Sequence, residues 1–262
     1  MRRAASAWRR AAPRRQQCSV AAPHGQKPSW LHQDRHLVCI NKPAGLRSQP
    51  DRTGDECARS SVGAALGHMP WVTHRLDRRV TGCLLLARTQ RAASRLGRFF
   101  SERRVTKHYL AICELPASDA LVPGAYVRLR SASGDALDYR VLDVRDGMAL
   151  LDVSPAGGRR HQIRRLLAED GEMPIAGDYR YGSTALPRVH NQVLALHAAT
   201  LQLPHPAAGY APLAIAAPLP AEWAAAPIPA TLAERAAAEL AVPPCGGDGV
   251  LWDPAPDFDE VL

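Results

Sequence analysis

Short apolar runs of strand length follow one another along most of this chain, with few helical stretches between them. The runs are bounded by Gly, Pro, Asn or Asp, which is typical of β-strands joined by turns. Strands and helices do not alternate regularly, so a parallel βαβ fold is not indicated. The pattern predicts an α+β fold built on a mostly antiparallel sheet. The predicted strands are HLVCI (36–40), TGCLLLAR (81–88), KHYLAIC (107–113), AYVRLR (125–130), DYRVLDV (138–144), ALLDVS (149–154) and VLALHAATLQLPHP (193–206).

Four segments carry helical signals. Residues 55–66 have helical periodicity, and Thr89 is placed as the N-cap of an amphipathic helix whose apolar positions recur at helical spacing. Residues 160–169 predict a helix whose arginines, four residues apart, share one face while its apolar residues share another. A last helix is predicted at 230–241.

Length and composition exclude several classes of protein. The chain has 262 residues, 46% of them hydrophobic, which is enough for one large or two small domains. Pro, Arg or a polar residue interrupts every apolar run before it reaches the roughly 18 residues that span a bilayer, so a transmembrane protein is excluded. The six cysteines form no C-x-x-C pair, which argues against zinc fingers and disulfide scaffolds. We expect them to be reduced thiols of an intracellular protein.

Basic residues outnumber acidic ones, 33 to 25, and their distribution is uneven. Residues 1–33 hold seven basic and no acidic side chains, whereas residues 222–262 hold eight acidic and one basic. The body of the chain between them is itself cationic, and the usual partner of such a body is a polyanion such as nucleic acid. A solvated basic surface without such a partner is the alternative that charge alone leaves open.

Composition divides the chain into three regions, 1–33, 34–217 and 218–262. Residues 1–27 are rich in Arg, Ala and Ser, contain no acid and lack the apolar core of a secretory signal, as organellar transit peptides do. We expect import, into mitochondria ahead of chloroplasts; the alternative is a basic arm that contacts RNA in a cytoplasmic protein. The last region is dominated by Pro, Ala and acids and is expected to be a poorly ordered tail.

Common signatures of enzymes are missing from the sequence. It contains no dinucleotide-binding, P-loop, zinc-protease or α/β-hydrolase motif, and its histidines lack metal-ligand spacing. Three segments are instead dense in charged and aromatic residues: HRLDRRVTG (74–82), KHYLA (107–111) and GRRHQIRRLL (158–167). In the first of them, arginines surround Asp77, and a carboxylate among cations stays ionised. A surface salt-bridge cluster is the simpler interpretation of that segment taken alone.

Together with INKPAG before them and GD…YG and LHA…HP among the later residues, these segments resemble the motifs of the RluA-type pseudouridine synthases. They occur in that family's order over about residues 34–217. The resemblance implies a mixed, mostly antiparallel central sheet with flanking helices and a catalytic RNA-binding cleft. It also implies isomerisation of specific uridines to pseudouridine in ribosomal, transfer or messenger RNA, with no metal and no organic cofactor. A monomer without membrane association is expected.

The resemblance also implies roles for individual residues. Asp77 in HRLD matches the family's catalytic aspartate, and Arg164 in HQIR matches the arginine that pairs with it. Tyr109 in KHYLA matches the tyrosine that stacks against the target base. Arg75 falls where the family's arginine enters the RNA stack in place of the flipped base. The sequence departs from the family pattern at VTG, Cys83 and RSQP, which bears on substrate choice more than on activity.

Other residues near these motifs are given less specific roles. Ile163 and Leu196 are expected to line the core or the substrate-binding cleft. Lys42 is expected to shape a turn beside the cleft, with a direct substrate contact as the alternative. His161 is expected to be a hydrogen-bonded structural residue, with a proton-shuttle role as the alternative. Asp178 is expected to close an Asx-turn rather than act as a second catalytic acid, because an aspartate in a turn often bonds to its own backbone.

The residues suit the implied reaction on chemical grounds as well. Detaching a base from its sugar, turning it and rejoining it through C5 needs an ionised group and a flat wall for the base. Asp77 can supply the first and Tyr109 the second. Two alternatives are a catalytically silent RNA-binding or ribosome-assembly factor with the same fold, and a glycoside hydrolase that uses Asp77 and Asp178 as its carboxylates.

Overall fold

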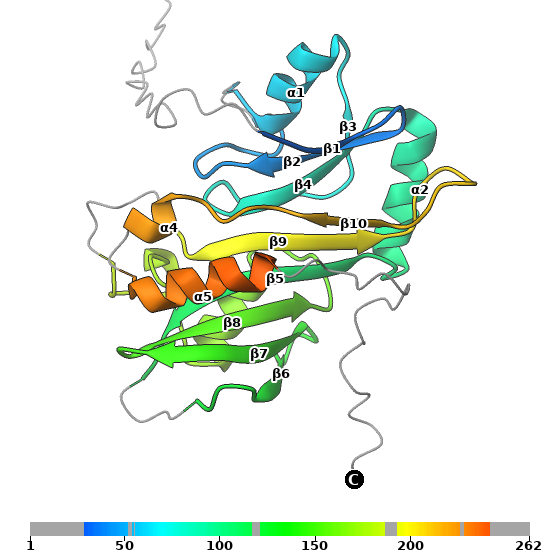
Figure 1. The fold of residues 1–262 in the computed structure, drawn as a ribbon. Helices are drawn as coiled ribbons and strands as arrows, with labels where there is room; N and C mark the ends of the chain where they lie inside the picture. Colours follow the sequence, from blue (N-terminus) through cyan, green and yellow to red (C-terminus); the bar gives the residue numbers. More distant parts are fainter. Residues whose placement is uncertain are drawn as a thin grey trace, which may run out of the picture.

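Ten strands form one sheet within the residues that the computed structural model describes, which are 29–51, 54, 56–116, 121–186, 193–225 and 228–241. Their order is β1-β2-β4-β9-β5-β8-β7-β6, with β10 beside β9 and β3 beside β4 (Figure 1). The strands are β1 (Ser29–Gln33), β2 (Leu37–Lys42), β3 (Trp71–Val72), β4 (Thr81–Ala87), β5 (Thr106–Glu114), β6 (Tyr126–Arg130), β7 (Ala136–Arg145), β8 (Met148–Pro155), β9 (Leu196–Leu203) and β10 (Leu213–Ala216).

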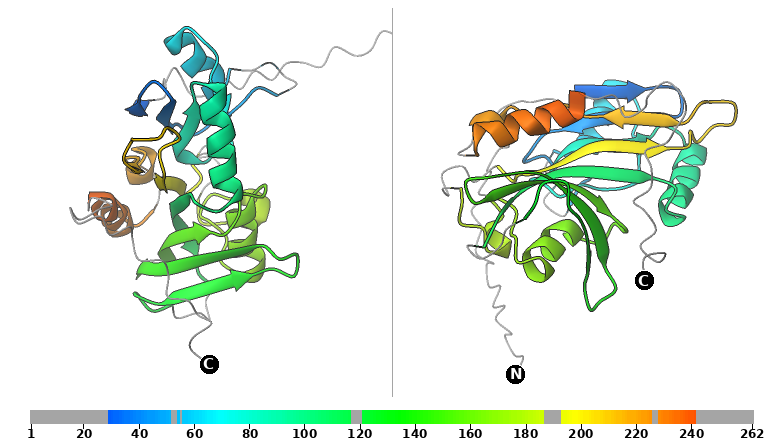
Figure 2. Two further views of the ribbon diagram at one scale, coloured as in Figure 1. Left: turned by 90° about the vertical axis from the view of Figure 1, so that its right-hand side faces the viewer. Right: turned by 60° about the horizontal axis from the view of Figure 1, so that its bottom comes forward.

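Helices lie on both sides of this sheet. Figure 2 shows α2 and α5 on opposite sides of it. Within the described ranges, none of the helices is long and apolar enough to cross a membrane. The helical elements are α1 (Ala58–Leu66), α2 (Gln90–Ser101), α3 (Gln162–Arg165), a π-helical turn (Leu166–Asp170), a 3-10 turn (Tyr179–Tyr181), α4 (Glu222–Ala225) and α5 (Ala230–Ala241).

The sheet is mixed at one place, where β4 and β9 run parallel, and its other strand pairs in the described region are antiparallel. The predicted α+β fold on a mostly antiparallel sheet is therefore confirmed. At the parallel step Gly82 pairs with Ala198, and Gly82 has φ 107°. A Cβ atom there would lie 2.2 Å from the carbonyl oxygen of Ala198, so the close approach requires glycine. The step brings the loop before β4 and the first residue of β9 to one end of the sheet.

β4 is buried along its whole length because both of its faces are covered. On one face, Cys83 and Leu85 pack in a cluster with Leu96 of α2. On the other face, Leu84 and Leu86 belong to the main core, which extends to the far strands of the sheet. A strand enclosed in this way gives a continuous apolar run in the sequence, which is the pattern that predicted it.

The chain after β10 packs onto the sheet, so the poorly ordered tail predicted from residue 218 is wrong for this part. Trp223 of α4 and Leu232 of α5 are almost fully buried in the main core. The helix predicted at 230–241 is confirmed, but the abundance of Pro, Ala and acids concealed the apolar residues on its inner face. Residues 242–262 lie outside the described residues.

The folded region also begins earlier than the predicted boundary at residue 34. β1 is antiparallel to β2, with Ser29 opposite Asn41, and so belongs to the sheet. The acid-free segment 1–27, on which the transit-peptide prediction depends, lies outside the described residues.

The helix predicted over 160–169 is in the right place but has an irregular form. One α-helical turn, α3, continues as a π-helical turn in which the N–H of Gly171 bonds to the carbonyl of Leu166 at 3.0 Å. Before α3, His161 has φ 57°, in the left-handed region that residues other than glycine rarely adopt. Irregularities of both kinds are frequent at functional sites.

Two histidines, the buried His197 and the half-buried His74, make the fold sensitive to acid. Burial lowers the pKa of His74 to about 3, and it lowers the pKa of His197 to about 4. His74 accepts a hydrogen bond from the N–H of Leu85 at 2.9 Å, and His197 bonds to the hydroxyl of Thr81 at 2.8 Å. Histidine in an unfolded chain titrates near pH 6.5, so below about pH 6.5 the unfolded state binds more protons than the folded state.

We therefore expect the free energy of unfolding to fall as the pH drops from about 6.5 towards 4, by at most about 1.4 kcal/mol per pH unit for each histidine. These two groups add no pH dependence above that range. Urea unfolding between about pH 8 and pH 5 measures the effect. A His197→Gln variant should show a weaker dependence, and a slope equal to that of the wild type would contradict the assignment.

Candidate active site

A cavity of about 590 Å³ lies between the loop before β4, the start of β5, the end of β8 and α3. Its size suits a small organic group such as a nucleotide. Residues far apart in the sequence meet in its lining, among them all the residues predicted for the site. These are Arg75, Asp77, Tyr109, Ile163, Arg164 and Leu196.

The buried hydroxyl of Ser48 fixes the loop that carries Asp77. Ser48 donates to the carbonyl of Leu76 at 2.9 Å and accepts from the N–H of the same residue at 3.0 Å. The N–H of Val80 bonds to the carbonyl of Asp77 at 3.1 Å and closes a turn. Leu76 and the backbone of Asp77 itself are therefore anchored, while the Asp77 side chain is 19% exposed and faces the cavity.

Lys42 supports the same loop from inside the protein. The side chain is fully buried, and its ammonium group donates to the carbonyls of Pro43 at 2.8 Å, Leu46 at 2.9 Å and Arg78 at 3.2 Å. Burial lowers the pKa of Lys42 to about 7, although the nearby charge of Asp77 opposes this shift. Lys42 does not line the cavity, so the expectation that it shapes a turn is confirmed.

Arg164 links two carboxylates at the wall of the cavity. Its Nη1 donates to Oδ2 of Asp77 at 3.0 Å, while Nε and Nη2 donate to the two oxygens of Asp178 at 2.6 and 2.7 Å. Burial opposes the positive charge of Arg164, but the bonds and charges of Asp178 and Asp77 outweigh it and raise the pKa of the guanidinium. The predicted pairing of Arg164 with Asp77 is therefore present in the structure.

Asp178 does not close the Asx-turn that was predicted for it. Its side chain is fully buried, and both oxygens bind Arg164 in a fork that fixes the plane of the guanidinium. The preceding Gly177 has φ 80°, and a Cβ atom there would lie 2.3 Å from the carbonyl oxygen of Val193. The G-D pair thus lets the backbone turn closely enough to bury the carboxylate behind Arg164.

His161 approaches the same oxygen of Asp77 that Arg164 binds. Its Nε2 lies 3.5 Å from Oδ2 of Asp77, and its Nδ1 lies 3.0 Å from the hydroxyl of Tyr181. The Arg164 guanidinium carbon lies 5.3 Å from the centre of the Tyr181 ring. Burial lowers the pKa of His161 more than the charge of Asp77 raises it, and nearby arginines lower it further. The expected hydrogen-bonded role of His161 is confirmed.

Tyr109 supplies an aromatic ring to the cavity from β5. Its backbone pairs with Val153 of β8 and, after an irregularity in the register, with Ala198 of β9. Burial above all, together with the charge of Asp77, raises the pKa of Tyr109, so the hydroxyl stays protonated. Ile163 and Leu196 are 7% and 3% exposed and add apolar surface to the same cavity. A planar group bound here meets a ring, apolar walls and one fixed carboxylate.

A family model described as RNA pseudouridylate synthase matches residues 36–169, which include Asp77, Tyr109 and Arg164. The chain belongs to this family. The dual-specificity RNA pseudouridine synthase RluA of Salmonella typhi is 31% identical over 204 residues, which are 68% of this chain and 88% of that protein. The protein is an RluA-type RNA pseudouridine synthase, an isomerase that converts uridine in RNA to pseudouridine.

Two further likenesses agree with this assignment. The mitochondrial pseudouridylate synthase RPUSD4 of Xenopus tropicalis is 30% identical over 252 residues, covering 74% of the synthase and 78% of that protein. The solved structure of human RNA pseudouridylate synthase domain containing 4 has a TM-score of 0.57 at 25% identity, covering 73% of the synthase and 88% of that chain. The family, fold and reaction implied by the sequence motifs are thus confirmed.

The rim of the synthase's cavity is positively charged. Arg75 is exposed there, and Arg103, Lys107 and Arg159 also line the cavity. Lys107 donates to the carbonyl of Gly157, which ties the rim of β5 to the segment before α3. Guanidinium and ammonium groups at the entrance suit the phosphates of an RNA chain. In the part of the chain that the structure describes, no three His, Cys, Asp or Glu side chains are grouped so as to hold a metal ion.

Sequence reasoning missed Ser48 and Tyr181, which shape the site of the synthase, and gave Asp178 the wrong role. Ser48 has no local signal, because its partner Leu76 lies 28 residues away. Asp178 and Tyr181 both lie in the GD…YG motif, so the motif marked their importance without revealing which residues they contact. The order of the contacts, from Asp178 through Arg164 to Asp77, depends on the tertiary fold.

Proposed function

We propose that Asp77 is the catalytic carboxylate of the synthase and that Arg164 holds it in its working position. The observation that carries this assignment is the continuous chain of hydrogen bonds from buried Asp178 through Arg164 to Asp77. It directs a charged carboxylate into a cavity of about 590 Å³ that also contains the ring of Tyr109. A fixed charge beside a flat surface is what this isomerisation requires.

The reaction breaks the bond between C1′ and N1 of uridine, turns the uracil and forms a bond between C1′ and C5. C5 then loses a proton and N1 gains one, so the atoms balance and no electrons enter or leave. Asp77 starts this sequence by acting on the sugar, and Arg164 keeps its oxygen in place. The target base has to leave the RNA stack first, at a cost of about a few kcal/mol. Arg75, exposed at the rim, enters the space that the base vacates and offsets part of this cost.

Tyr109 holds the detached uracil while it turns. Stacking on an aromatic ring resists movement out of the plane but tolerates rotation within it. Ile163 and Leu196 enclose the base from other directions and exclude water. We propose these three side chains as the surface on which the uracil rotates.

A pair of substitutions at Tyr109 separates stacking from proton transfer. Tyr109→Phe keeps the ring and removes the hydroxyl, so we expect it to retain measurable turnover. Tyr109→Ala removes the ring and is expected to lose about 1–3 kcal/mol of base stacking, with a correspondingly larger loss of turnover. Single-turnover rates with the same RNA measure both variants. Equal losses would assign the main role to the hydroxyl and contradict the stacking role.

We also propose that the synthase acts on RNA inside mitochondria. The acid-free, arginine-rich segment 1–27 supports import, and the Xenopus tropicalis relative carries the word mitochondrial in its name. A fusion of this segment to a fluorescent reporter should accumulate in mitochondria. Chloroplast import or a diffuse cytosolic signal would overturn this part of the proposal.

The experiment that tests the function is a map of pseudouridine in mitochondrial and cytosolic RNA with and without the gene. We expect specific mitochondrial sites to disappear with the gene and to return when the wild type is restored. Expression of the Asp77→Asn variant in place of the wild type should leave those sites unmodified. The proposal is wrong if no pseudouridine site depends on the gene, or if the Asp77→Asn variant restores modification of such a site.

A further inference from the structure

A second hollow, of about 300 Å³, lies beside the active-site cavity on the far side of the last turn of α2. One wall is formed by Arg95 and Arg98 of α2 together with Arg104 of the following loop. The opposite wall is the Pro204–Ala208 segment, which follows β9. The pseudouridine synthase assignment and the mechanism proposed above make no use of this hollow.

The arginines of the first wall carry more charge than nearby acids neutralise. Arg95 donates to the carbonyl of Pro206 at 2.6 Å, an uncharged partner. Arg98 and Arg104 share a single carboxylate, that of Glu102, at 2.6 and 3.6 Å. Three guanidinium groups therefore face one carboxylate at this place. The excess positive charge of this wall suits an anion, and the forked guanidinium group is the side chain best suited to phosphate oxygens.

An aromatic ring orients one of these arginines. The guanidinium carbon of Arg104 lies 4.6 Å from the centre of the Phe99 ring, which also lines the hollow. Stacking of this kind limits the conformations of a long side chain and lowers the entropy lost when it binds a ligand. Arg98 and Arg104 remain accessible, with 72% and 47% of their side chains exposed.

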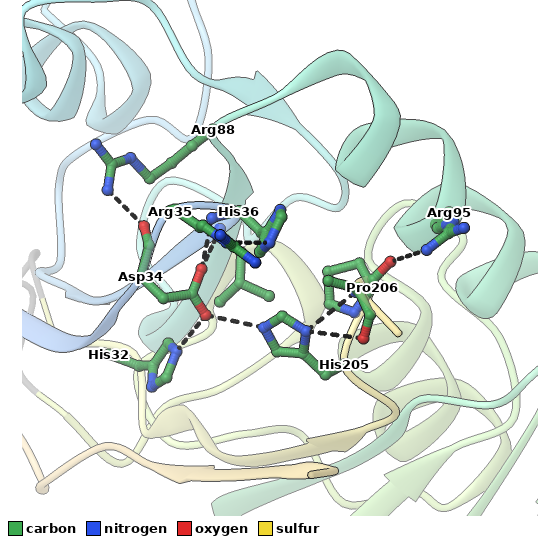
Figure 3. Close-up of polar contacts among 10 residues, drawn as sticks. His32, Asp34, Arg35, His36, Arg88, Arg95, His205 and Pro206 are labelled. Atoms are coloured by element: carbon green, nitrogen blue, oxygen red, sulfur yellow. Dashed lines mark hydrogen bonds and ion pairs between the residues drawn. The ribbon is translucent and has the colours of Figure 1, made fainter. Parts of the chain in front are cut away.

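Polar contacts around Asp34 hold the second wall in place (Figure 3). Oδ2 of Asp34 binds His205 at 2.9 Å and His32 at 3.0 Å, while its Oδ1 accepts the backbone N–H groups of His36 and Leu37. Although burial opposes it, these bonds hold the pKa of Asp34 below its usual range. Asp34 itself does not line the hollow; its carboxylate instead anchors His205, which does.

The Pro204–Ala208 wall is stiffened further by ring stacking. His205 is buried and stacks on Tyr210, with the ring centres 4.2 Å apart and an angle of 13° between the planes. The carbonyl of Pro206 points to Arg95 of the facing wall, as Figure 3 shows. The Pro204–Ala208 wall and Arg95 are therefore held in place before any ligand binds.

Adjacent residues of one chain segment line the hollow and the active-site cavity. Phe100 and Arg103 line the cavity that contains Asp77, whereas their chain neighbours Phe99 and Arg104 line the hollow. Neighbouring residues are about 3.8 Å apart along the chain. An RNA strand that leaves the cavity over this segment can therefore reach from the positively charged rim to the arginines of the hollow.

We propose that this hollow binds backbone phosphates of the RNA nucleotides that flank the target uridine. The proposal rests on the RNA pseudouridine synthase activity and extends it to the substrate outside the catalytic cavity. The ligand is recognised by its charge and not by its bases, so the hollow adds affinity and orients the strand without selecting the sequence. It takes no part in the chemical step.

A double variant, Arg98→Gln/Arg104→Gln, tests this proposal. Both side chains are exposed, so the fold should be unaffected. With an RNA transcript that contains a mapped target uridine, we expect weaker binding and a higher KM, while kcat at saturating RNA stays unchanged. Each lost phosphate contact on a single strand lowers the slope of log Kd against log salt by about 0.7, so two lost contacts should lower it by about 1.4. A short oligonucleotide that fills the catalytic cavity alone should bind both proteins equally.

The matched control is Arg145→Gln/Arg235→Gln, which removes the same charge from exposed positions on β7 and α5 that line neither hollow nor cavity. This control should keep the affinity and salt slope of the wild type. The proposal is overturned if the Arg98/Arg104 variant binds like the wild type, if the control loses as much affinity, or if kcat falls while KM does not change. Failure of the synthase activity itself would look different, because the wild type would form no pseudouridine while RNA binding could still be compared.

Discussion

An Asp77→Asn variant is expected to form no detectable pseudouridine and to bind RNA within about tenfold of the wild type. Asparagine has the shape of aspartate but cannot attack the sugar or take a proton from it as a carboxylate does. The amide oxygen can still accept the hydrogen bond from Arg164, so the wall of the cavity should keep its form. RNA affinity depends mainly on phosphate contacts made by basic groups elsewhere, which this change leaves in place.

A matched substitution controls for the general effect of replacing a carboxylate. Asp146 is exposed in the turn between β7 and β8 and has φ 50°, a conformation that asparagine tolerates well. Asp146→Asn should therefore keep full activity. Pseudouridine formation is measured by chemical mapping of a transcript, and affinity is measured by titration of the same RNA. Product at a rate near that of the wild type with Asp77→Asn would remove Asp77 from the mechanism.

Much of the fold could be predicted because its local patterns agree with the tertiary structure. β4 is enclosed on both faces and appears in the sequence as an unbroken apolar run. Thr89 was predicted as an N-cap, and its hydroxyl accepts from the N–H of Ala92 at 3.2 Å at the start of α2. In both cases the residues that determine the structure are near neighbours in the chain, so the sequence pattern contains the information.

Errors arose where packing between distant segments decides the structure. Composition suggested a poorly ordered tail, but a few apolar side chains such as Trp223 and Leu232 are enough to dock α4 and α5 on the sheet. Regular periodicity suggested an α-helix over 160–169, whereas the chain changes to a π-helical turn after Arg165. Neither feature has a signal within its own segment.

Among the site residues, too, the roles that local motifs mark could be predicted, and the roles that depend on distant contacts could not. The short motifs indicated Asp77 and Arg164 as a pair, since both lie in recognisable segments. The role of Asp178 could not be derived from its own surroundings, because a G-D sequence is equally typical of a simple turn. Its function follows from the fork of hydrogen bonds to Arg164, 14 residues earlier in the chain.

The contacts of Asp178 and Arg164 predict that stability and catalysis respond differently to their removal. Both residues are buried: Asp178 is fully buried and Arg164 is 6% exposed. Arg164→Met leaves the charge of Asp178 buried without its hydrogen-bonded partner, and Asp178→Leu leaves Arg164 with only one of its two carboxylate partners, Asp77. Removing one partner of a buried ion pair costs about 3–5 kcal/mol, whereas replacing both with apolar side chains is often neutral. Each single variant should therefore be strongly destabilised, and the double variant should recover much of the lost stability.

Turnover should not recover with stability. Without Arg164, nothing in this network positions the carboxylate of Asp77, so Arg164→Met and the double variant Arg164→Met/Asp178→Leu should both be inactive. Asp178→Leu should lose most of its turnover because the guanidinium is no longer held in plane. Since the three side chains act as one unit, adding Asp77→Asn to Arg164→Met should cause no further loss. Urea unfolding and single-turnover rates on the same proteins measure the two effects. Destabilisations that simply add in the double variant, or activity that returns along with its stability, would show that Asp178 and Arg164 are not coupled as their contacts indicate.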